Sequence, residues 1–251
     1  MRTTVRIDKL LSSHGFGTRK DVKKLLHSGT VTVDGTAVTA ADTQVEPETQ
    51  VIRVNGEPLV VQQHIYIMMN KCRDVVCATK DGLHKTVFDL LDFKYRGRLP
   101  GGELHITGRL DIDTEGLLLL TTDGKLTHRL TSPKTHVPKT YYVELANPVS
   151  EAEKEEYTAL FKNGIDVPAE SNEEAFKAQS ALLCWKKNDD KTCTLTIHEG
   201  KYHQIKRMFK VTGNEVSYLK RIAIGKLSLD PALQTGAYRE LSESELELLT
   251  Q

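Results

Sequence analysis

An aspartate precedes a run of four leucines in residues 108–124, GRLDIDTEGLLLLTTDG. The apolar run 117–120 is too short for an isolated helix and is bounded by Gly116 and the Asp123-Gly124 turn, so it predicts a strand buried on both faces. Asp111 then lies at the mouth of a core strand, where its carboxylate can be aimed at a substrate. An aspartate near a glycine is otherwise most often a turn former.

A second segment whose side chains could take part in catalysis is Lys139-Thr140-Tyr141, at the start of a predicted strand over 140–145. Successive strand residues face opposite sides, so Tyr141 shares one face with Val143 and Leu145, while Tyr142 lies on the other face with Glu144. A strand tyrosine seen alone is more often a core residue than a catalytic one. Tyr142 competes with Tyr141 for any role in a site.

The third segment is EGKYHQIKRMF, residues 199–209, which opens a predicted helix ended by Gly213. Helical spacing directs four side chains inward: Ile205, Met208, Phe209 and Thr212. Three basic side chains are expected on the opposite face: His203, Arg207 and Lys210. Lys206 lies at the edge of the apolar stripe, where a lysine can simply be a surface residue.

The order GRLD, then T-x-GLLLLT-x-DG, resembles the active-site signature of RNA pseudouridine synthases, in the branch that modifies ribosomal RNA. The resemblance implies that Asp111 is the catalytic aspartate and that Lys206 pairs with it and favours its ionised form. It also implies that Tyr141 stacks on the uracil and helps proton removal. Whether the aspartate attacks the sugar, attacks the ring or removes a sugar proton is left open.

Arg109 is expected on the same side of an extended strand as Asp111. The resemblance implies that it contacts RNA around a base flipped out of its stack; its alternative is an ion pair with Asp113 or Glu115. One departure concerns the loop that reads N-K-P-x-G in relatives, where this chain has Asn70-Lys71-Cys72-Arg73-Asp74. This change is expected to alter a loop beside the site without removing a catalytic residue.

Residues 1–58 read as a compact unit of two helices and short strands. A helix is expected from Ile7 to His14, and Thr18 with Asp21 forms a capping-box start for a second helix ended by Gly29. The Asp34-Gly35 and Asn55-Gly56 pairs predict hairpin turns. The order R-x-D-K-L-L, G-x-G-T-R-K, S-G-x-V-x-V-D-G resembles the alpha-L RNA-binding domain. That resemblance implies RNA contacts for Arg19, Lys20, Lys23 and Lys24, which otherwise form a solvated helix face.

Charge distribution is more informative than the formal net charge of zero. Residues 1–40 hold seven Lys or Arg against three Asp, and residues 196–226 hold seven against two Glu. Two basic segments on a neutral chain indicate local phosphate binding. No apolar stretch is long enough for a signal peptide or a membrane span, so a cytoplasmic location is expected. The four cysteines form no Cys-x-x-Cys pair and are expected to be free thiols, with no metal site.

After a linker at 59–64, residues 65–251 are expected to form the catalytic domain. Strands are predicted at 65–70, 75–78, the GRLD pair, 140–145, 178–185 and 192–197, with helices at 87–91, 126–130 and 150–161. This order predicts an α+β fold with a mixed, largely antiparallel sheet, preceded by a small α/β RNA-binding domain.

The whole chain is therefore identified by resemblance as an RNA pseudouridine synthase, closest to the group acting on small-subunit (16S) ribosomal RNA. The expected partner is ribosomal RNA, in a partly assembled small-subunit particle, and the protein is expected to be a monomer that needs no cofactor. Further RNA contacts are expected from Lys139, His203, Arg207 and Lys210. The rivals are the same reaction on 23S RNA and a catalytically silent RNA-binding or ribosome-assembly protein.

Overall fold

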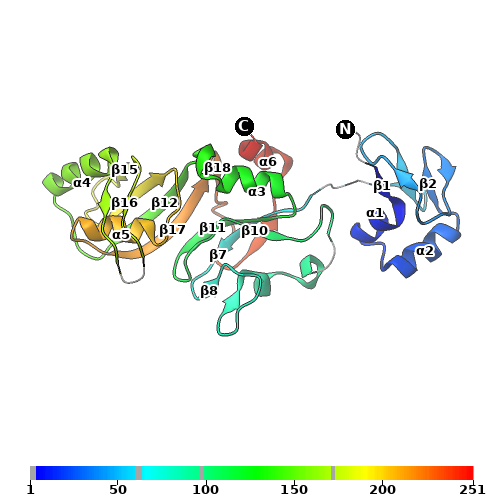
Figure 1. The fold of residues 1–251 in the computed structure, drawn as a ribbon, viewed down its shortest axis with the longest axis horizontal. Helices are drawn as coiled ribbons and strands as arrows, with labels where there is room; N and C mark the ends of the chain where they lie inside the picture. Colours follow the sequence, from blue (N-terminus) through cyan, green and yellow to red (C-terminus); the bar gives the residue numbers. More distant parts are fainter. Residues whose placement is uncertain (1–3, 60, 62–63, 97–98, 171–172, 251) are drawn as a thin grey trace. The chain divides into compact units, whose positions relative to one another are not determined.

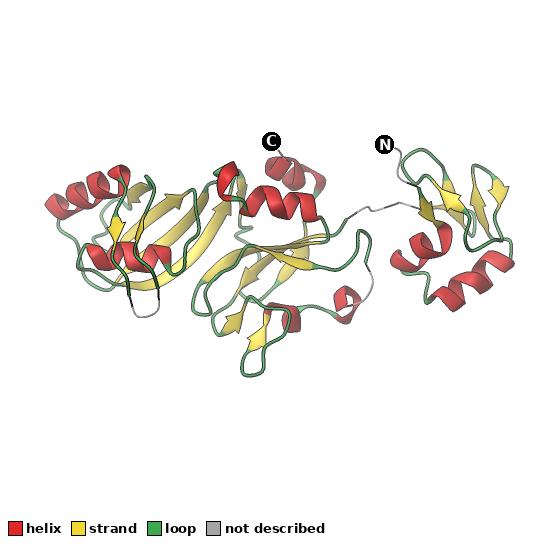
Figure 2. Cartoon of the chain, viewed as in Figure 1, coloured by secondary structure: helices red, strands yellow, loops and turns green. Residues whose placement is uncertain are grey.

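The computed structural model describes residues 4–59, 61, 64–96, 99–170 and 173–250. The chain forms two compact units, residues 1–65 with 93–104 and residues 66–92 with 105–251. Figures 1 and 2 show the helices and strands of each unit. The predicted linker 59–64 includes residues 60, 62 and 63, which lie outside the described residues, as do residues 1–3 of the predicted first domain. The predicted boundary places residues 93–104 in the catalytic domain, whereas they group with the first unit.

The first unit packs two helices against short strands. Its elements are β1 (Val5–Arg6), α1 (Ile7–Ser13), α2 (Arg19–His27), β2 (Val31–Val33), β3 (Thr36–Ala37), β4 (Gln44–Val45), β5 (Ile52–Val54), β6 (Glu57–Pro58) and the 3-10 helix η2 (Phe93–Arg96). Thr18 and Asp21 form the predicted capping box. The turns at Asp34 and Asn55 adopt left-handed backbone conformations, as the predicted hairpins require.

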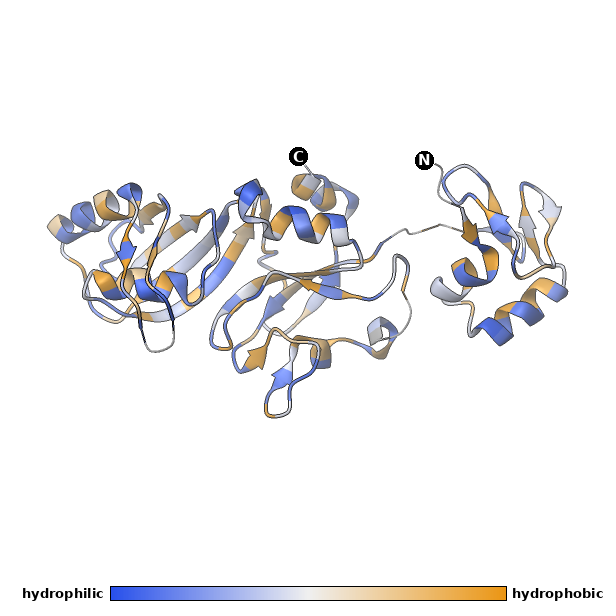
Figure 3. Cartoon of the chain, in the orientation of Figure 1, coloured by the Kyte–Doolittle hydropathy of each residue, from blue (hydrophilic) through white to orange (hydrophobic). Residues whose placement is uncertain are grey.

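The core of this unit explains the pattern of its second helix. Val22 and Leu26 of α2 are fully buried against a cluster that includes Ile7 and Leu11 of α1. The charged residues of α2 remain exposed, and Figure 3 shows them as hydrophilic segments between the apolar ones. α2 therefore presents the basic face that its sequence predicts.

The second unit is built on a nine-stranded sheet with the order β15-β16-β12-β17-β11-β7-β19, with β10 paired to β11 and β18 to β17. The strands of this sheet are β7 (Tyr66–Lys71), β10 (His105–Thr107), β11 (Glu115–Thr121), β12 (Lys139–Leu145), β15 (Leu182–Trp185), β16 (Thr192–Ile197), β17 (Val216–Ile224), β18 (Leu227–Ser228) and β19 (Tyr238–Glu240). Within this sheet the β11–β17 pair is parallel and the other pairs are antiparallel. This is the predicted mixed, largely antiparallel sheet of an α+β fold.

Helices and short strands surround this sheet. They are β8 (Val75–Val76), β9 (Lys85–Thr86), η1 (Val87–Leu90), α3 (Gly124–Thr131), η3 (Pro133–Thr135), α4 (Glu151–Asn163), β13 (Asp166–Val167), β14 (Phe176–Lys177), α5 (Gln204–Val211) and α6 (Glu243–Thr250). Leu117 and Leu119 of β11 join a buried cluster with residues of α3 and α6. Leu118 and Leu120 are also buried, so the leucine run is covered on both faces, as predicted.

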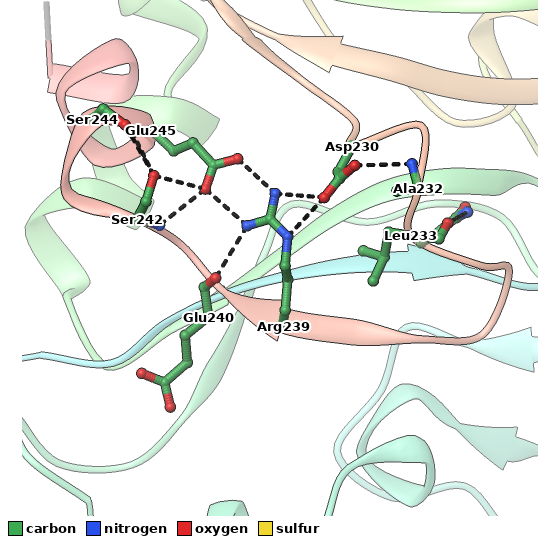
Figure 4. Close-up of polar contacts among 9 residues, drawn as sticks. Asp230, Ala232, Leu233, Arg239, Glu240, Ser242, Ser244 and Glu245 are labelled. Carbon is green, nitrogen blue, oxygen red and sulfur yellow. Dashed lines mark hydrogen bonds and ion pairs between the residues drawn. The ribbon is translucent and has the colours of Figure 1, made fainter.

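The last strand and helix are connected by a network around one arginine (Figure 4). The Arg239 guanidinium donates to Asp230 Oδ2 over 2.9 Å and to both Glu245 carboxylate oxygens over 2.7 and 2.8 Å. Its hydrogen bonds to Glu245 lower the pKa of that carboxyl to about 2. The network attaches α6 to the edge strand β19.

Candidate active site

Asp111 lies in a loop between β10 and β11, not in a strand. The Thr114 amide donates to the Asp111 carbonyl over 3.1 Å and closes a turn. The expectation that GRLD forms an extended strand with Arg109 beside Asp111 is therefore wrong. The prediction that Asp111 precedes the core strand is correct, and its side chain keeps 29% of its surface exposed.

Lys71, at the end of β7, holds this loop. Its side chain is fully buried, and its ammonium donates to the carbonyls of Asp111, Ile112 and Thr114 over 3.1, 3.2 and 2.9 Å. A fourth acceptor is the Cys72 carbonyl, at 3.0 Å. Burial lowers the pKa of Lys71. The sequence pattern places this residue in a variant loop, whereas it ends a strand and anchors the segment that carries Asp111.

Lys206 reaches the same loop from α5. Its ammonium lies 2.6 Å from Asp113 Oδ1 and 3.4 Å from Asp111 Oδ2. Burial raises the pKa of Asp113, but the hydrogen bond and charge of Lys206 outweigh that effect, so the pKa is lowered overall. The structure thus brings Lys206 close to Asp111. Asp113 is a second partner of Lys206, whereas the sequence analysis names Asp113 only as a possible ion-pair partner of Arg109.

His203 also faces the carboxylate. Its Nε2 lies 3.8 Å from Asp111 Oδ1. Asp111 therefore lies between two basic side chains that are three residues apart on one turn of chain. Lys206 places a positive charge beside a partly exposed carboxylate, where it can attract a negatively charged RNA backbone.

Tyr141 approaches the site through strand pairing. It is paired with Arg221 of β17, and Arg221 is paired with Gly116 of β11, five residues after Asp111. Tyr141 is buried, with 7% of its surface exposed. Tyr142, on the other face, donates to Glu144 Oε1 over 2.8 Å. Because the Tyr142 hydroxyl is bonded to Glu144, Tyr141 is the better candidate for the site. The catalytic role of Tyr141 stays a prediction.

Arg221 is a residue of this region that sequence reasoning misses. This side chain is 2% exposed, its Nε donates to the Leu117 carbonyl over 2.7 Å, and its Nη2 has no partner among the described residues. Burial lowers the pKa of Lys139, and the charge of Arg221 lowers it further. Lys139 donates to the Val137 carbonyl over 3.1 Å, so its ammonium is directed to its own chain rather than free in solvent.

Of the basic residues expected to bind RNA, six are exposed, Lys139 and His203 are partly exposed, and Arg207 is buried. Arg19, Lys20, Lys23, Lys24 and Arg109 are exposed. Lys210 is exposed as well and forms an ion pair with Glu170.

Arg207 is the exception, because it is buried. Only 6% of its surface is exposed, and its Nη2 donates to the Pro168 and Glu174 carbonyls over 2.8 and 2.9 Å. The guanidinium also lies over the Phe176 ring. The expectation of a solvent-facing Arg207 is wrong because the β13–β14 hairpin covers that face of α5.

Within the described ranges, no cluster of three or more His, Cys, Asp or Glu side chains is arranged to hold a metal ion. Cys72, Cys77, Cys184 and Cys193 are free thiols. None of the helices in the described part of the chain combines the length and hydropathy needed to cross a membrane.

Comparison with known proteins agrees with this geometry. Residues 65–210 match the model of the RNA pseudouridylate synthase family, and residues 5–51 match the S4 domain. An uncharacterized RNA pseudouridine synthase of Bacillus subtilis is 46% identical over 249 residues, 98% of this chain and 99% of the relative. The ribosomal small subunit pseudouridine synthase A of Vibrio vulnificus is 40% identical over 97% of this chain and 98% of its own length. A crystal structure of a pseudouridylate synthase, 38% identical, superposes with a TM-score of 0.65 over 98% of this chain and 99% of that one. The chain therefore belongs to the RNA pseudouridine synthase family and carries an S4 domain near its amino terminus.

Proposed function

We propose that this protein isomerises one uridine of small-subunit (16S) ribosomal RNA to pseudouridine, with Asp111 as the catalytic carboxylate. The observation that carries the proposal is the position of Asp111. It is a partly exposed carboxylate within 3.4 Å of Lys206 and 3.8 Å of His203, on a loop held by the buried Lys71. Relatives that match essentially the full chain are named for the small ribosomal subunit, which supports 16S RNA as the substrate.

The reaction breaks the bond from ribose to the base nitrogen N1 and forms a new bond from ribose to the ring carbon C5. C5 loses its proton and N1 gains one, so the protons balance. No atom is added or removed and no electron is transferred, so no cofactor enters the balance. Asp111 supplies the carboxylate that assists this exchange, as a nucleophile or as a base. Lys206 keeps positive charge beside that carboxylate while the base is detached. Tyr141 lines the uracil site and takes part in proton removal.

RNA is also bound outside the catalytic site, by the S4 domain and by Arg109. Lys20, Lys23 and Lys24 on the exposed face of α2 contact phosphates, and Arg109 contacts RNA beside the flipped base. A partly assembled small-subunit particle is the preferred substrate, because flipping a base costs a few kcal/mol even before tertiary structure buries it. The protein acts as a monomer in the cytoplasm.

The test maps pseudouridines in ribosomal RNA from cells with and without the gene. The purified protein is then incubated, without added cofactor and with a chelator, with naked 16S RNA, protein-bound 16S intermediates, mature small subunits and 23S RNA. The proposal expects one new pseudouridine in 16S RNA or its intermediates and little in mature subunits. Product confined to 23S RNA would refute the target, and the absence of any product would favour a silent RNA-binding protein.

A further inference from the structure

Tyr202 exposes an aromatic ring beside the candidate active site. Among the Phe, Tyr and Trp side chains in the described part of the chain, only Phe93 and Tyr202 are exposed. Tyr202 keeps 53% of its surface accessible. Aromatic rings stabilise a fold chiefly when they are buried, so an exposed ring at a site is a candidate contact for a ligand.

The ring of Tyr202 is stacked on the imidazole of His203. Their centroids lie 3.8 Å apart with an interplanar angle of 22°. The same imidazole reaches to within 3.8 Å of the Asp111 carboxylate. Tyr202 therefore contacts His203, which in turn lies beside Asp111. A single imidazole separates the exposed ring from the catalytic carboxylate.

Hydrogen bonds of the buried Gln204 stabilise the turn that carries these rings. Gln204 is buried, its Oε1 accepts from the Lys201 amide over 2.9 Å, and its Nε2 donates to Glu199 Oε1 over 2.7 Å. His203 itself adopts a left-handed backbone conformation, with φ 46° and ψ 30°. Such a conformation is unfavourable for a residue other than glycine and persists only where neighbouring contacts impose it. The segment that carries the two rings therefore has a defined conformation.

We propose that Tyr202, supported by His203, is a stacking platform for an unpaired RNA base adjacent to the target uridine. The inference rests on the proposed function, because it takes the flipped uridine to lie at Asp111. Flipping that nucleotide breaks its stacking with its neighbours, so an adjacent base is left with an uncovered π face. Tyrosine and histidine rings are among the side chains on which single-stranded RNA bases stack.

The charge around the platform favours RNA over an apolar protein partner. Residues 196–226 hold seven Lys or Arg against two Glu; Arg207 and Arg221 among them are buried, and Lys201, Lys210 and Lys226 are exposed. The exposed Lys201 directly precedes Tyr202 in the chain. Every base has a π face, so stacking here selects an unpaired neighbour rather than a particular sequence.

The experiment uses the full-length protein and a single-stranded RNA fragment centred on the uridine identified by mapping. The fluorescent base 2-aminopurine replaces the nucleotide on one side of that uridine or on the other. Binding of the wild-type protein is expected to quench the probe at one of the two positions. Tyr202→Ala should abolish this quenching and raise KM on the order of tenfold, with a smaller effect on kcat. Tyr202→Phe, which keeps the ring, should restore both.

The control is Leu182→Ala, which truncates an exposed apolar side chain on the edge strand β15 and should leave quenching and KM unchanged. Quenching that persists in Tyr202→Ala, or that is lost equally in Tyr202→Phe, overturns the platform. Pseudouridine formed by the wild-type protein on the unlabelled fragment is measured separately. Product without quenching at either position refutes the platform alone, whereas absence of product on every RNA refutes the proposed function.

Discussion

The ammonium group of Lys206 lies 2.6 Å from the carboxylate of Asp113. The same ammonium is 3.4 Å from Asp111, so one cation serves two carboxylates of a single loop. Asp113 is the more exposed of the two, at 58% against 29%. This geometry separates a role in holding Lys206, which fits Asp113, from a role in chemistry, which fits Asp111.

Exchange of Lys206 for methionine should lower kcat on the order of 100-fold, because the positive charge beside the reacting carboxylate is removed. Lys206→Arg keeps the charge and should recover part of the loss. Asp113→Asn should cost less than about tenfold, since Lys206 is then free to pair with Asp111. Single-turnover rates with saturating RNA measure all three. A larger loss in Asp113→Asn than in Lys206→Met would contradict this division of roles.

Lys71→Met should both destabilise the protein and slow the reaction. Four carbonyl acceptors are deprived of their donor, and each buried unsatisfied group costs about 1 to 3 kcal/mol. The loop that carries Asp111 also loses its anchor, and a misplaced catalytic group lowers kcat on the order of 100-fold. Thermal unfolding and turnover at a temperature where the variant is folded measure the two effects. The exposed Lys187→Met is the control, and a Lys71→Met variant as stable and active as that control would refute the anchoring role.

Several elements can be predicted because their signals are local. The capping box of Thr18 and Asp21 starts α2, and the leucine run forms β11. The segment 108–114 departs from the predicted strand because its conformation is imposed by Lys71, about 40 residues earlier in the chain. Such a tertiary constraint leaves no periodic pattern in the loop itself.

The remaining errors have the same origin. Helical spacing correctly separates Arg207 from the apolar stripe, but it cannot show that the β13–β14 hairpin covers the other face of α5. The sequence pattern does not predict β17, although this strand is central in the sheet, because Lys220 and Arg221 interrupt its apolar residues. Arg221 lies in a central strand between β11 and β12, and its Nε donates to the Leu117 carbonyl of β11, a long-range contact that no local pattern indicates.

The basic face of α2 should contribute to the salt dependence of RNA binding. Changing Lys20, Lys23 and Lys24 to Gln should weaken binding and reduce the log-log slope with salt by about 0.7 to 0.9 for each phosphate that the protein no longer neutralises. A triple variant at the exposed Lys162, Lys186 and Lys187 changes the net charge equally and is the matched control. Equal slopes for the two triple variants would mean that α2 makes no special phosphate contact.

The Arg239–Glu245 pair should stabilise the protein at neutral pH and less in acid. The folded pKa of Glu245 is about 2, below its ordinary value of 4.5, so its contribution is complete above pH 4.5 and is lost as pH falls toward 2. Because the pair is partly exposed, the contribution is taken as roughly 1 kcal/mol. Urea unfolding of Glu245→Gln and the wild-type protein at about pH 7 and about pH 3.5 measures it. The difference between them should shrink at the lower pH, and a difference that grows in acid would contradict the assignment.

The most direct test of the account is Asp111→Asn, which keeps the volume of the side chain and removes its charge and basicity. RNA affinity and thermal stability should stay near those of the wild-type protein, because the Asp111 side chain is partly exposed and Lys206 retains Asp113 as a partner. Chemical mapping of 16S RNA after incubation with this variant should detect no pseudouridine at the position modified by the wild-type protein. Substantial pseudouridine at that position would contradict the assignment of Asp111 as the catalytic carboxylate.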